Sequence, residues 1–195
     1  ALAALLVVAL FLLVRDATGR PGIAAALAFG FALVPPFLFY FFQFYPEMVG
    51  ALVMAVAFRT LALRPQGLGR HPWLFGGMLA TLPWLHQKFL PVWLVLVATA
   101  LWVGLRSKAL GMTAPRRRWL AGLLVPTATS LYLTALYNFA ITGSVRPDAL
   151  FLAWGPGGVT GARVGQGVLG LLLDARYGIL PYAPILMLAA AGLVL

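Results

Sequence analysis

The chain has 195 residues, of which 63% are hydrophobic and only 9% are charged, and its mean hydropathy is +0.97. Soluble domains carry roughly a quarter charged residues, so this composition excludes an ordinary soluble domain and indicates an integral membrane protein. Lys and Arg number 14 against 4 Asp and Glu, which gives a net charge of +10. The sequence contains no Cys, which excludes disulfides, thiolate metal sites and cysteine nucleophiles within it.

Seven apolar stretches follow one another along the chain, separated by short polar or Pro- and Gly-rich joints. Helices of this length satisfy their own backbone groups in lipid, and the stretches lack the alternation of barrel strands. We therefore predict an all-α, polytopic membrane protein with about seven spans. The stretches cover residues 1–14, 22–42, 48–63, 73–85, 89–105, 119–137 and 185–195.

The first and last stretches are shorter than a complete span. At about 1.5 Å per residue, a helix over residues 1–14 covers about 21 Å of a hydrocarbon core about 30 Å thick. The stretch 185–195 also stops inside an apolar run. We expect both spans to be truncated and residues 1–195 to form a single transmembrane domain within a longer protein.

Two internal spans are predicted to be irregular. Pro35 and Pro36 should kink the second span, because each proline removes a backbone donor and crowds the preceding turn. The stretch 73–85 is short for a full crossing, so we expect it to be tilted, kinked or only partly inserted.

The distribution of the cations predicts the orientation of the spans. Ten cations fall in three alternate joints, namely Arg15, Arg20, Arg59, Arg64, Arg70, Arg106, Lys108, Arg116, Arg117 and Arg118. The opposite joints hold Lys88, Arg146, Arg163 and Arg176, together with Glu47, Asp148 and Asp174. By the positive-inside rule, the first set is cytoplasmic and Glu47 lies on the outer face. Membrane topology thus accounts for the positive charge, and we do not expect nucleic acid to be a partner.

The longest stretch between predicted spans, residues 138–181, shares the outer face with Glu47 and forms the predicted periplasmic loop. Within it, the apolar residues of segment 163–177 have helical spacing, which predicts a helix lying along the interface. Gly165, Gly167 and Gly170 fit the G-x-G-x-x-G pattern, but no strand precedes them and an acid follows too soon for a dinucleotide site. These glycines instead favour close packing against a neighbouring helix.

Glu47 is the first candidate functional residue, because it is a single carboxylate between two long apolar runs. An ionisable group near the end of a membrane helix is costly unless it meets water, a partner or a substrate. A helix cap is the alternative, since Pro46 suits a first helical turn and Glu47 would favour the positive end of the helix dipole. Both interpretations stay open at this point.

The hairpin around Lys88 is the second candidate. His86 and Lys88 offer donors for a phosphate group. The alternative is that Lys88 extends to the membrane surface and Trp84 belongs to an interfacial aromatic belt. Asp174 and Arg176 likewise suit either substrate binding or a structural contact in the outer loop.

Four groups of residues then carry a family resemblance. They are Tyr45-Pro46-Glu47, Leu82-Pro83-Trp84-Leu85-His86-Gln87-Lys88-Phe89, Tyr137-Asn138 with Gly143-Ser144 and Pro147, and the segment 170–184. Together they resemble bacterial GT-C glycosyltransferases of the protein mannosyltransferase and lipid A aminoarabinose transferase group. The resemblance implies transfer of a sugar from a polyprenyl phosphate to a lipid, glycan or protein acceptor, at the outer face of the bacterial cytoplasmic membrane. It also implies that the principal acidic base lies in a first outer loop, upstream of these residues.

The chemistry of such a transfer assigns roles to the polar residues of the outer face. A carboxylate must take the proton of the acceptor hydroxyl, and cations or a metal must hold the departing phosphate. Glu47 is the candidate catalytic residue, as auxiliary acid, acceptor contact or metal ligand. The candidate substrate and phosphate contacts are Tyr45, His86, Lys88, Arg146, Asp148, Asp174 and Arg176. A divalent metal is a candidate cofactor, with no ligand set assigned.

Three alternative functions stay open. If the protein is not a glycosyltransferase, we expect a transporter or flippase of a lipid-linked glycan, an O-antigen polymerase or ligase, or an assembly subunit. Transporters concentrate charges near the membrane midplane, whereas the charges here cluster at the outer boundary, which favours the enzyme.

Overall fold

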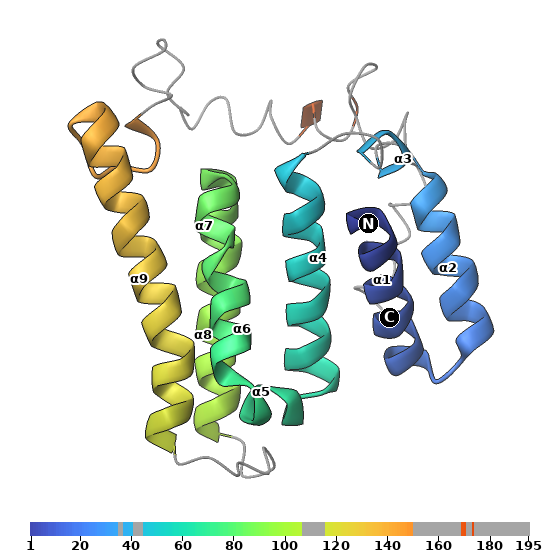
Figure 1. The fold of residues 1–195 in the computed structure, drawn as a ribbon. Helices are drawn as coiled ribbons and strands as arrows, with labels where there is room; N and C mark the ends of the chain where they lie inside the picture. Colours follow the sequence, from blue (N-terminus) through green and yellow to red (C-terminus); the bar gives the residue numbers. More distant parts are fainter. Residues whose placement is uncertain (35–36, 41–44, 107–115, 150–168, 171–172, 174–195) are drawn as a thin grey trace.

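The computed structural model describes residues 1–34, 37–40, 45–106, 116–149, 169–170 and 173, and these residues form a bundle of helices lying side by side (Figure 1). Within this part of the chain all regular structure is helical, which confirms the predicted all-α class. The α-helices are α1 (Leu2–Thr18), α2 (Pro21–Leu33), α3 (Phe37–Tyr40), α4 (Pro46–Phe58), α5 (Gln66–Arg70), α6 (Pro72–Ala80), α7 (Leu82–Leu85), α8 (Leu90–Arg106) and α9 (Arg116–Thr142). A π-helical turn, Arg59–Leu63, continues α4, and a 3₁₀ turn, Gln87–Phe89, precedes α8.

Three helical segments of the described chain are long and apolar enough to cross a membrane. They are Pro46–Leu63 with 18 residues, Gln87–Arg106 with 20 and Arg116–Thr142 with 27. At about 1.5 Å per residue, the longest extends about 40 Å, more than the hydrocarbon core requires. The helical character predicted for residues 48–63, 89–105 and 119–137 is therefore confirmed.

Proline and glycine mark the helix boundaries. Pro21, Pro46 and Pro72 occupy the first residue of α2, α4 and α6, where a missing N–H costs nothing and the fixed φ suits the helix. Gly19 and Gly143 end α1 and α9 with positive φ angles of 69° and 71°. Their N–H groups donate to carbonyls four residues back, each at 2.8 Å, which closes the last turn.

The second predicted span, residues 22–42, is not one continuous helix. α2 ends at Leu33, because Val34 takes an extended conformation with φ −83° and ψ 131°. A residue before proline avoids the α region, and Val34 precedes Pro35. The predicted kink at Pro35 and Pro36 falls outside the described residues, and the short helix α3 follows them.

The crossing predicted to be irregular, residues 73–85, is divided at Thr81 into α6 and α7. Pro83 has no N–H to continue the helical ladder, and the Trp84 N–H donates to the Thr81 carbonyl at 3.1 Å. The Ala80 carbonyl instead accepts a hydrogen bond from the Ser130 hydroxyl of α9. The neighbouring helix α9 thus supplies a hydrogen bond to a carbonyl group that the break leaves without its helical partner.

Close packing joins α6 to α9 through two glycines. A Cβ on Gly122 would approach the side chain of Pro72 to 2.9 Å, and a Cβ on Gly76 would overlap the α9 backbone at Gly122. Small residues let helix backbones approach in this way. The main apolar core spans α4 to α9, and a smaller cluster around Leu6, Ala9, Met48 and Ala55 joins α1 to α4.

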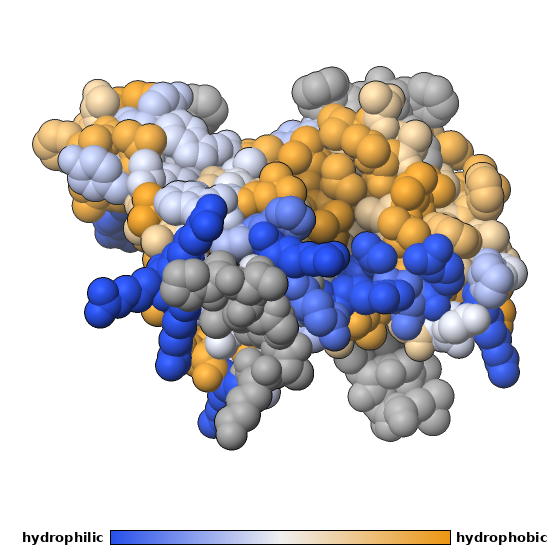
Figure 2. Space-filling view, turned by 60° about the horizontal axis from the view of Figure 1, so that its bottom comes forward, coloured by the Kyte–Doolittle hydropathy of each residue, from blue (hydrophilic) through white to orange (hydrophobic). Residues whose placement is uncertain are grey.

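The charged side chains of the described chain divide between the two ends of the bundle. We call one the Asp16 end, where α1 finishes and the π-turn and α9 carry their arginines, and Figure 2 shows hydrophilic side chains gathered there. We call the other the Glu47 end, which comprises the start of α4, the 3₁₀ turn and the end of α9. This division agrees with the alternation of joints predicted from the sequence.

Candidate functional site

Glu47 is the second residue of α4, directly after Pro46. Its Oε1 accepts a hydrogen bond from Lys88 Nζ in an ion pair. Its Oε2 is buried and has no hydrogen-bond partner among the described residues. The side chain is 31% exposed. Glu47 therefore lies in the first helical turn, as the cap interpretation expects, and also has a charged partner 41 residues away in the sequence.

The position of Lys88 is set by the 3₁₀ turn that precedes α8. The Lys88 N–H donates to His86 Nδ1 at 3.2 Å, and the Phe89 N–H donates to the His86 carbonyl at 3.0 Å. The Phe89 ring then packs against Gly50, where a Cβ would overlap it. Gly50 lies one turn after Glu47 on the same helix, so residues three apart share a face. This contact holds the turn against α4 and brings Lys88 to Glu47.

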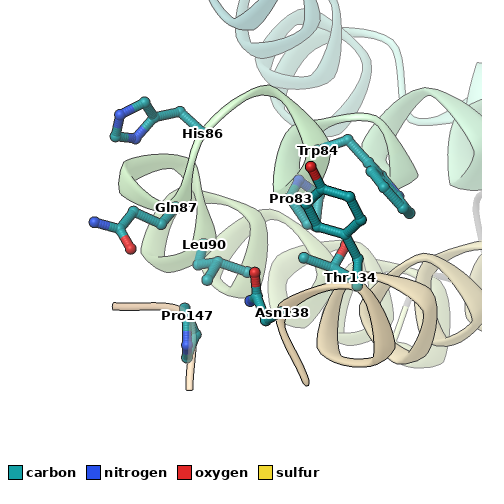
Figure 3. A pocket seen from close by; sticks show the side chains of 9 residues that line it. Pro83, Trp84, His86, Gln87, Leu90, Thr134, Asn138 and Pro147 are labelled. Atoms are coloured by element: carbon teal, nitrogen blue, oxygen red, sulfur yellow. The ribbon is translucent and has the colours of Figure 1, made fainter. Parts of the chain in front are cut away.

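A cavity of about 250 Å³ lies next to this turn, between α7, the 3₁₀ turn, the start of α8 and the end of α9. In Figure 3, His86 and Gln87 border one side of it, while Trp84 and Thr134 lie on the other. The complete lining is Pro83, Trp84, His86, Gln87, Leu90, Thr134, Tyr137, Asn138 and Pro147. An apolar cavity with a few polar groups is typical of a small-molecule site, although this volume lies just below the usual range of about 300–1,000 Å³.

The cavity walls combine aromatic and polar groups. The rings of Trp84 and Tyr137 are 6.0 Å apart between centroids and tilted by 53°. Thr134 and Asn138 lie one turn apart on α9, and Gln87 Oε1 is buried without a hydrogen-bond partner in the described structure. A buried acceptor of this kind favours a ligand or water donor, because unpaired buried polar groups cost free energy.

Arg146 and Asp148 form a bidentate pair at the rim of this cavity. Arg146 Nε donates to Asp148 Oδ1 at 3.1 Å, and a terminal guanidinium nitrogen donates to Oδ2 at 2.9 Å. The Arg146 guanidinium lowers the pKa of Asp148, and the carboxylate raises the pKa of Arg146. Pro147 lies between them and lines the cavity. The structure thus pairs these two predicted residues with each other, on either side of a residue of the cavity lining.

The remaining predicted residues are only partly placed. Tyr45 is the extended residue directly before α4 and is 44% exposed, and its side chain makes no capping hydrogen bond. Asp174 and Arg176 lie outside the described residues, as do most of the predicted interfacial helix 163–177 and most of the outer loop 138–181. In the described chain, no group of three or more His, Asp or Glu side chains is arranged to hold a metal ion.

Sequence reasoning missed two features. Asp16 contacts Arg15, Arg59 and Arg64, residues that the topology analysis treated only as cytoplasmic cations. These arginines, Arg64 foremost, hold the pKa of the Asp16 carboxyl well below its usual range. The available signal was that Asp16 is the one acidic residue in the cation-rich joints.

The second missed feature is the polar face of α9. Thr134 and Asn138 have an i, i+4 spacing in a long apolar helix, so they share one face. Sequence reasoning used Asn138 for the family resemblance and as the start of the outer loop and assigned no role to Thr134, whereas the structure places both residues on the cavity wall.

Together, the fold and the site define an α-helical protein with helices of membrane-spanning length and a carboxylate–lysine pair beside a small cavity at one end. No protein-family model, curated protein or solved structure matches the chain.

Proposed function

We propose that the protein is a membrane glycosyltransferase that transfers a sugar from a polyprenyl-phosphate donor to an acceptor at the outer face of the bacterial cytoplasmic membrane. The observation that supports this proposal most is the hydrogen bonding of the two Glu47 carboxylate oxygens. One oxygen is held by Lys88, while the other is buried and unpaired within the described structure, at the end of apolar helices. A carboxylate that is held on one oxygen and unsatisfied on the other is suited to accept a hydrogen bond from a substrate hydroxyl group.

The site residues have complementary roles in this reaction. The acceptor hydroxyl oxygen attacks the anomeric carbon, the bond from that carbon to the phosphate oxygen breaks, and the phosphate leaves with the bonding electrons. Glu47 Oε2 orients the acceptor hydroxyl and assists removal of its proton, beside the principal base that the family resemblance assigns upstream. Lys88 and His86 supply donors to the phosphate, whose negative charge grows as the bond breaks.

The cavity next to the 3₁₀ turn is suited to bind part of one of the two substrates. Its aromatic wall, Trp84 and Tyr137, offers a flat surface for a sugar ring or a prenyl segment, and Thr134 and Asn138 offer hydrogen bonds to hydroxyl groups. Arg146 and Asp148 at the rim add charged groups of both signs. The 3₁₀ turn connects the cavity to the Glu47–Lys88 pair through His86 and Lys88.

The proposal includes the membrane arrangement. The three long helices, together with the other apolar stretches, make about seven spans, and segment 163–177 lies along the outer interface. The Asp16 end is cytoplasmic under the positive-inside rule, which puts Glu47 and Lys88 on the outer side. Charges at the boundary suit transfer from a lipid carrier whose phosphate lies at the membrane surface.

A transfer assay in lipid tests the function. The protein is reconstituted in vesicles with radiolabelled polyprenyl-phosphate sugars, and transfer to lipid, glycan and protein acceptors is measured. We expect Glu47→Gln and Lys88→Ala each to lower the rate on the order of 100-fold, the lower part of the range for proton transfer by a positioned group. Lys88→Arg keeps the charge and should retain part of the activity.

Arg116→Gln is the matched control, because it removes one charge from the opposite end of the bundle. It should leave transfer unchanged. If Glu47→Gln and Lys88→Ala also leave transfer unchanged, Glu47 is a helix cap and Lys88 an interfacial anchor. If the wild-type protein transfers no sugar from any donor, the proposed function is wrong.

A further inference from the structure

A cluster of three arginines surrounds Asp16 at the end of the bundle opposite Glu47. Arg59 and Arg64 contact its carboxylate at 2.7 and 3.1 Å, and Arg15 contacts it at 3.3 Å. The Asp16 side chain is only 3% exposed, so the carboxylate is enclosed by these guanidinium groups. The Asp16 carboxylate therefore links the end of α1 to the π-turn and to Arg64, the residue that follows the turn.

This cluster keeps a net positive charge, because three guanidinium groups outnumber one carboxylate. Each guanidinium has five N–H groups, and Asp16 accepts hydrogen bonds from only some of them. Arg64 is 60% exposed and Arg15 is 40% exposed. The cluster is therefore preorganised by Asp16 and still able to hold a second anion, with the geometry that suits a phosphate group.

An apolar groove of about 330 Å³ leads to the same cluster. It lies between α1, α4 and α6, and Leu12, Val56 and Met78 are among its lining residues. The lining also includes Arg59, its one charged member. Val8, another lining residue, is half exposed, so the groove opens at the surface of the bundle.

We propose that this groove and the arginine cluster together bind an anionic phospholipid. One acyl chain lies in the groove, and the headgroup phosphate contacts Arg59 and Arg64. Lipid tails are as apolar as the groove, so the groove alone gives little preference for any lipid. The preference comes from the cations at its charged end, which attract anionic headgroups over zwitterionic ones.

Charge complementarity selects this occupant. A soluble anion would use the arginines and leave the apolar groove unexplained, whereas a zwitterionic lipid would use the groove and leave the net positive charge unexplained. An anionic phospholipid uses both at once. In this arrangement the groove faces lipid, and lipid binding there does not depend on sugar transfer at the Glu47 end.

Native mass spectrometry of lipids retained by the protein tests this site. The protein is reconstituted in bilayers of phosphatidylglycerol and phosphatidylcholine in equal amounts, released, and its bound lipids are counted. We expect phosphatidylglycerol to be retained on the order of tenfold over phosphatidylcholine. Arg64→Gln should lower this preference about fivefold, since one cation of the cluster is lost while Arg15 and Arg59 still hold Asp16.

Two further variants distinguish binding of a lipid in the groove from nonspecific attraction of anionic lipids by the cations at this end of the bundle. Val8→Trp fills the groove from an exposed position and should reduce retention with every arginine intact. Arg116→Gln removes a charge at the same end of the bundle from a residue outside the groove lining, and it should leave the preference unchanged. Thermal unfolding of each variant in the same detergent confirms that it is folded.

Equal retention of the two lipids by the wild-type protein would overturn the proposal. An equal loss of preference in Arg64→Gln and Arg116→Gln would also overturn it, because it would show a diffuse surface effect. A wild-type dimer that persists in Arg64→Gln and is lost in Val8→Trp would assign the groove to a second copy of the chain instead.

Discussion

Glu47 and Asp16 are carboxylates at opposite ends of the bundle, and they meet their cations in different ways. Asp16 is enclosed by three arginines, and each of its oxygens accepts hydrogen bonds from guanidinium groups. Glu47 has one lysine on Oε1, and its Oε2 is unpaired within the described structure. Asp16 is 3% exposed, whereas Glu47 is 31% exposed.

This difference separates a structural ion cluster from a candidate reactive site. A carboxylate whose oxygens are both occupied fixes the elements around it and has little capacity for a substrate, since buried polar groups are stable only when paired. A carboxylate with an unused oxygen retains the capacity to accept a hydrogen bond from a substrate hydroxyl group. We therefore expect changes at Asp16 to affect stability most, and changes at Glu47 to affect activity most.

The largest expected effect on stability follows Asp16→Asn. The substitution removes the charge that holds three guanidinium groups together, so the cations repel one another and α1 loses its contact with the π-turn. We expect the unfolding temperature in detergent to fall at least twice as far as it does for Glu47→Gln. An equal or larger fall for Glu47→Gln would contradict the comparison.

Low pH should reduce the stability that the Asp16 cluster contributes to the fold. The pKa of the Asp16 carboxyl is lower in the folded protein than in the unfolded chain, where it is about 3.9. The stability it contributes is therefore fully present above about pH 4 and is lost as the pH falls below that value toward the folded pKa. We expect Asp16→Asn to lose less stability than the wild type when the pH is lowered from about 4 to about 2, as measured by thermal unfolding.

Gly50→Ala tests how the Glu47 end is positioned. A Cβ at Gly50 overlaps the far edge of the Phe89 ring, so the ring must shift, and we expect the 3₁₀ turn to shift with it and to loosen the contact of Lys88 with Glu47. Overpacking of this kind costs about 1–3 kcal/mol, and we expect sugar transfer to fall with it. Gly77→Ala is the control, because no atom lies within 4 Å of the added Cβ and alanine favours the helix. Equal rates of sugar transfer in the two variants would show that the Phe89 contact does not position Lys88.

Ser130→Ala has the smallest expected effect. The Ser130 hydroxyl donates to the Ala80 carbonyl, which the break between α6 and α7 leaves available. Removing this hydrogen bond should cost about 1 kcal/mol, measurable as a lower unfolding temperature. Thr129→Ala serves as a neighbouring control on α9. A loss of stability no greater than that of the control would show that the hydrogen bond does not support the break.

The helical class and the long helices were predictable from the sequence, because composition and the length of apolar runs determine what is stable in lipid. The sequence also placed Glu47 and Lys88 at the same end, since alternate joints between spans share a face. Their pairing was not predictable, because it depends on the Phe89 ring meeting Gly50 across two helices. The Asp16 cluster was missed for a similar reason, as Arg59 and Arg64 reach Asp16 only through the packing of α4 on α1.

Local chemistry explains the differences in helix boundaries. The end of α2 at Leu33 follows from Val34 preceding Pro35, because a residue before proline avoids the α-helical region. The break at Thr81 has a different cause, because Pro83 has no N–H to continue the helical hydrogen bonds, and the short apolar stretch in the sequence indicated an irregular crossing.

Exchange of the two charges, Glu47→Lys with Lys88→Glu, separates a reactive Glu47 from a structural one when both stability and sugar transfer are measured. The exchange restores an ion pair between α4 and the 3₁₀ turn but moves the carboxylate to the other side of the site. We expect an unfolding temperature close to that of the wild type and a transfer rate as low as in Glu47→Gln. Transfer at the wild-type rate would contradict this expectation, because the pair would then act only as a structural link.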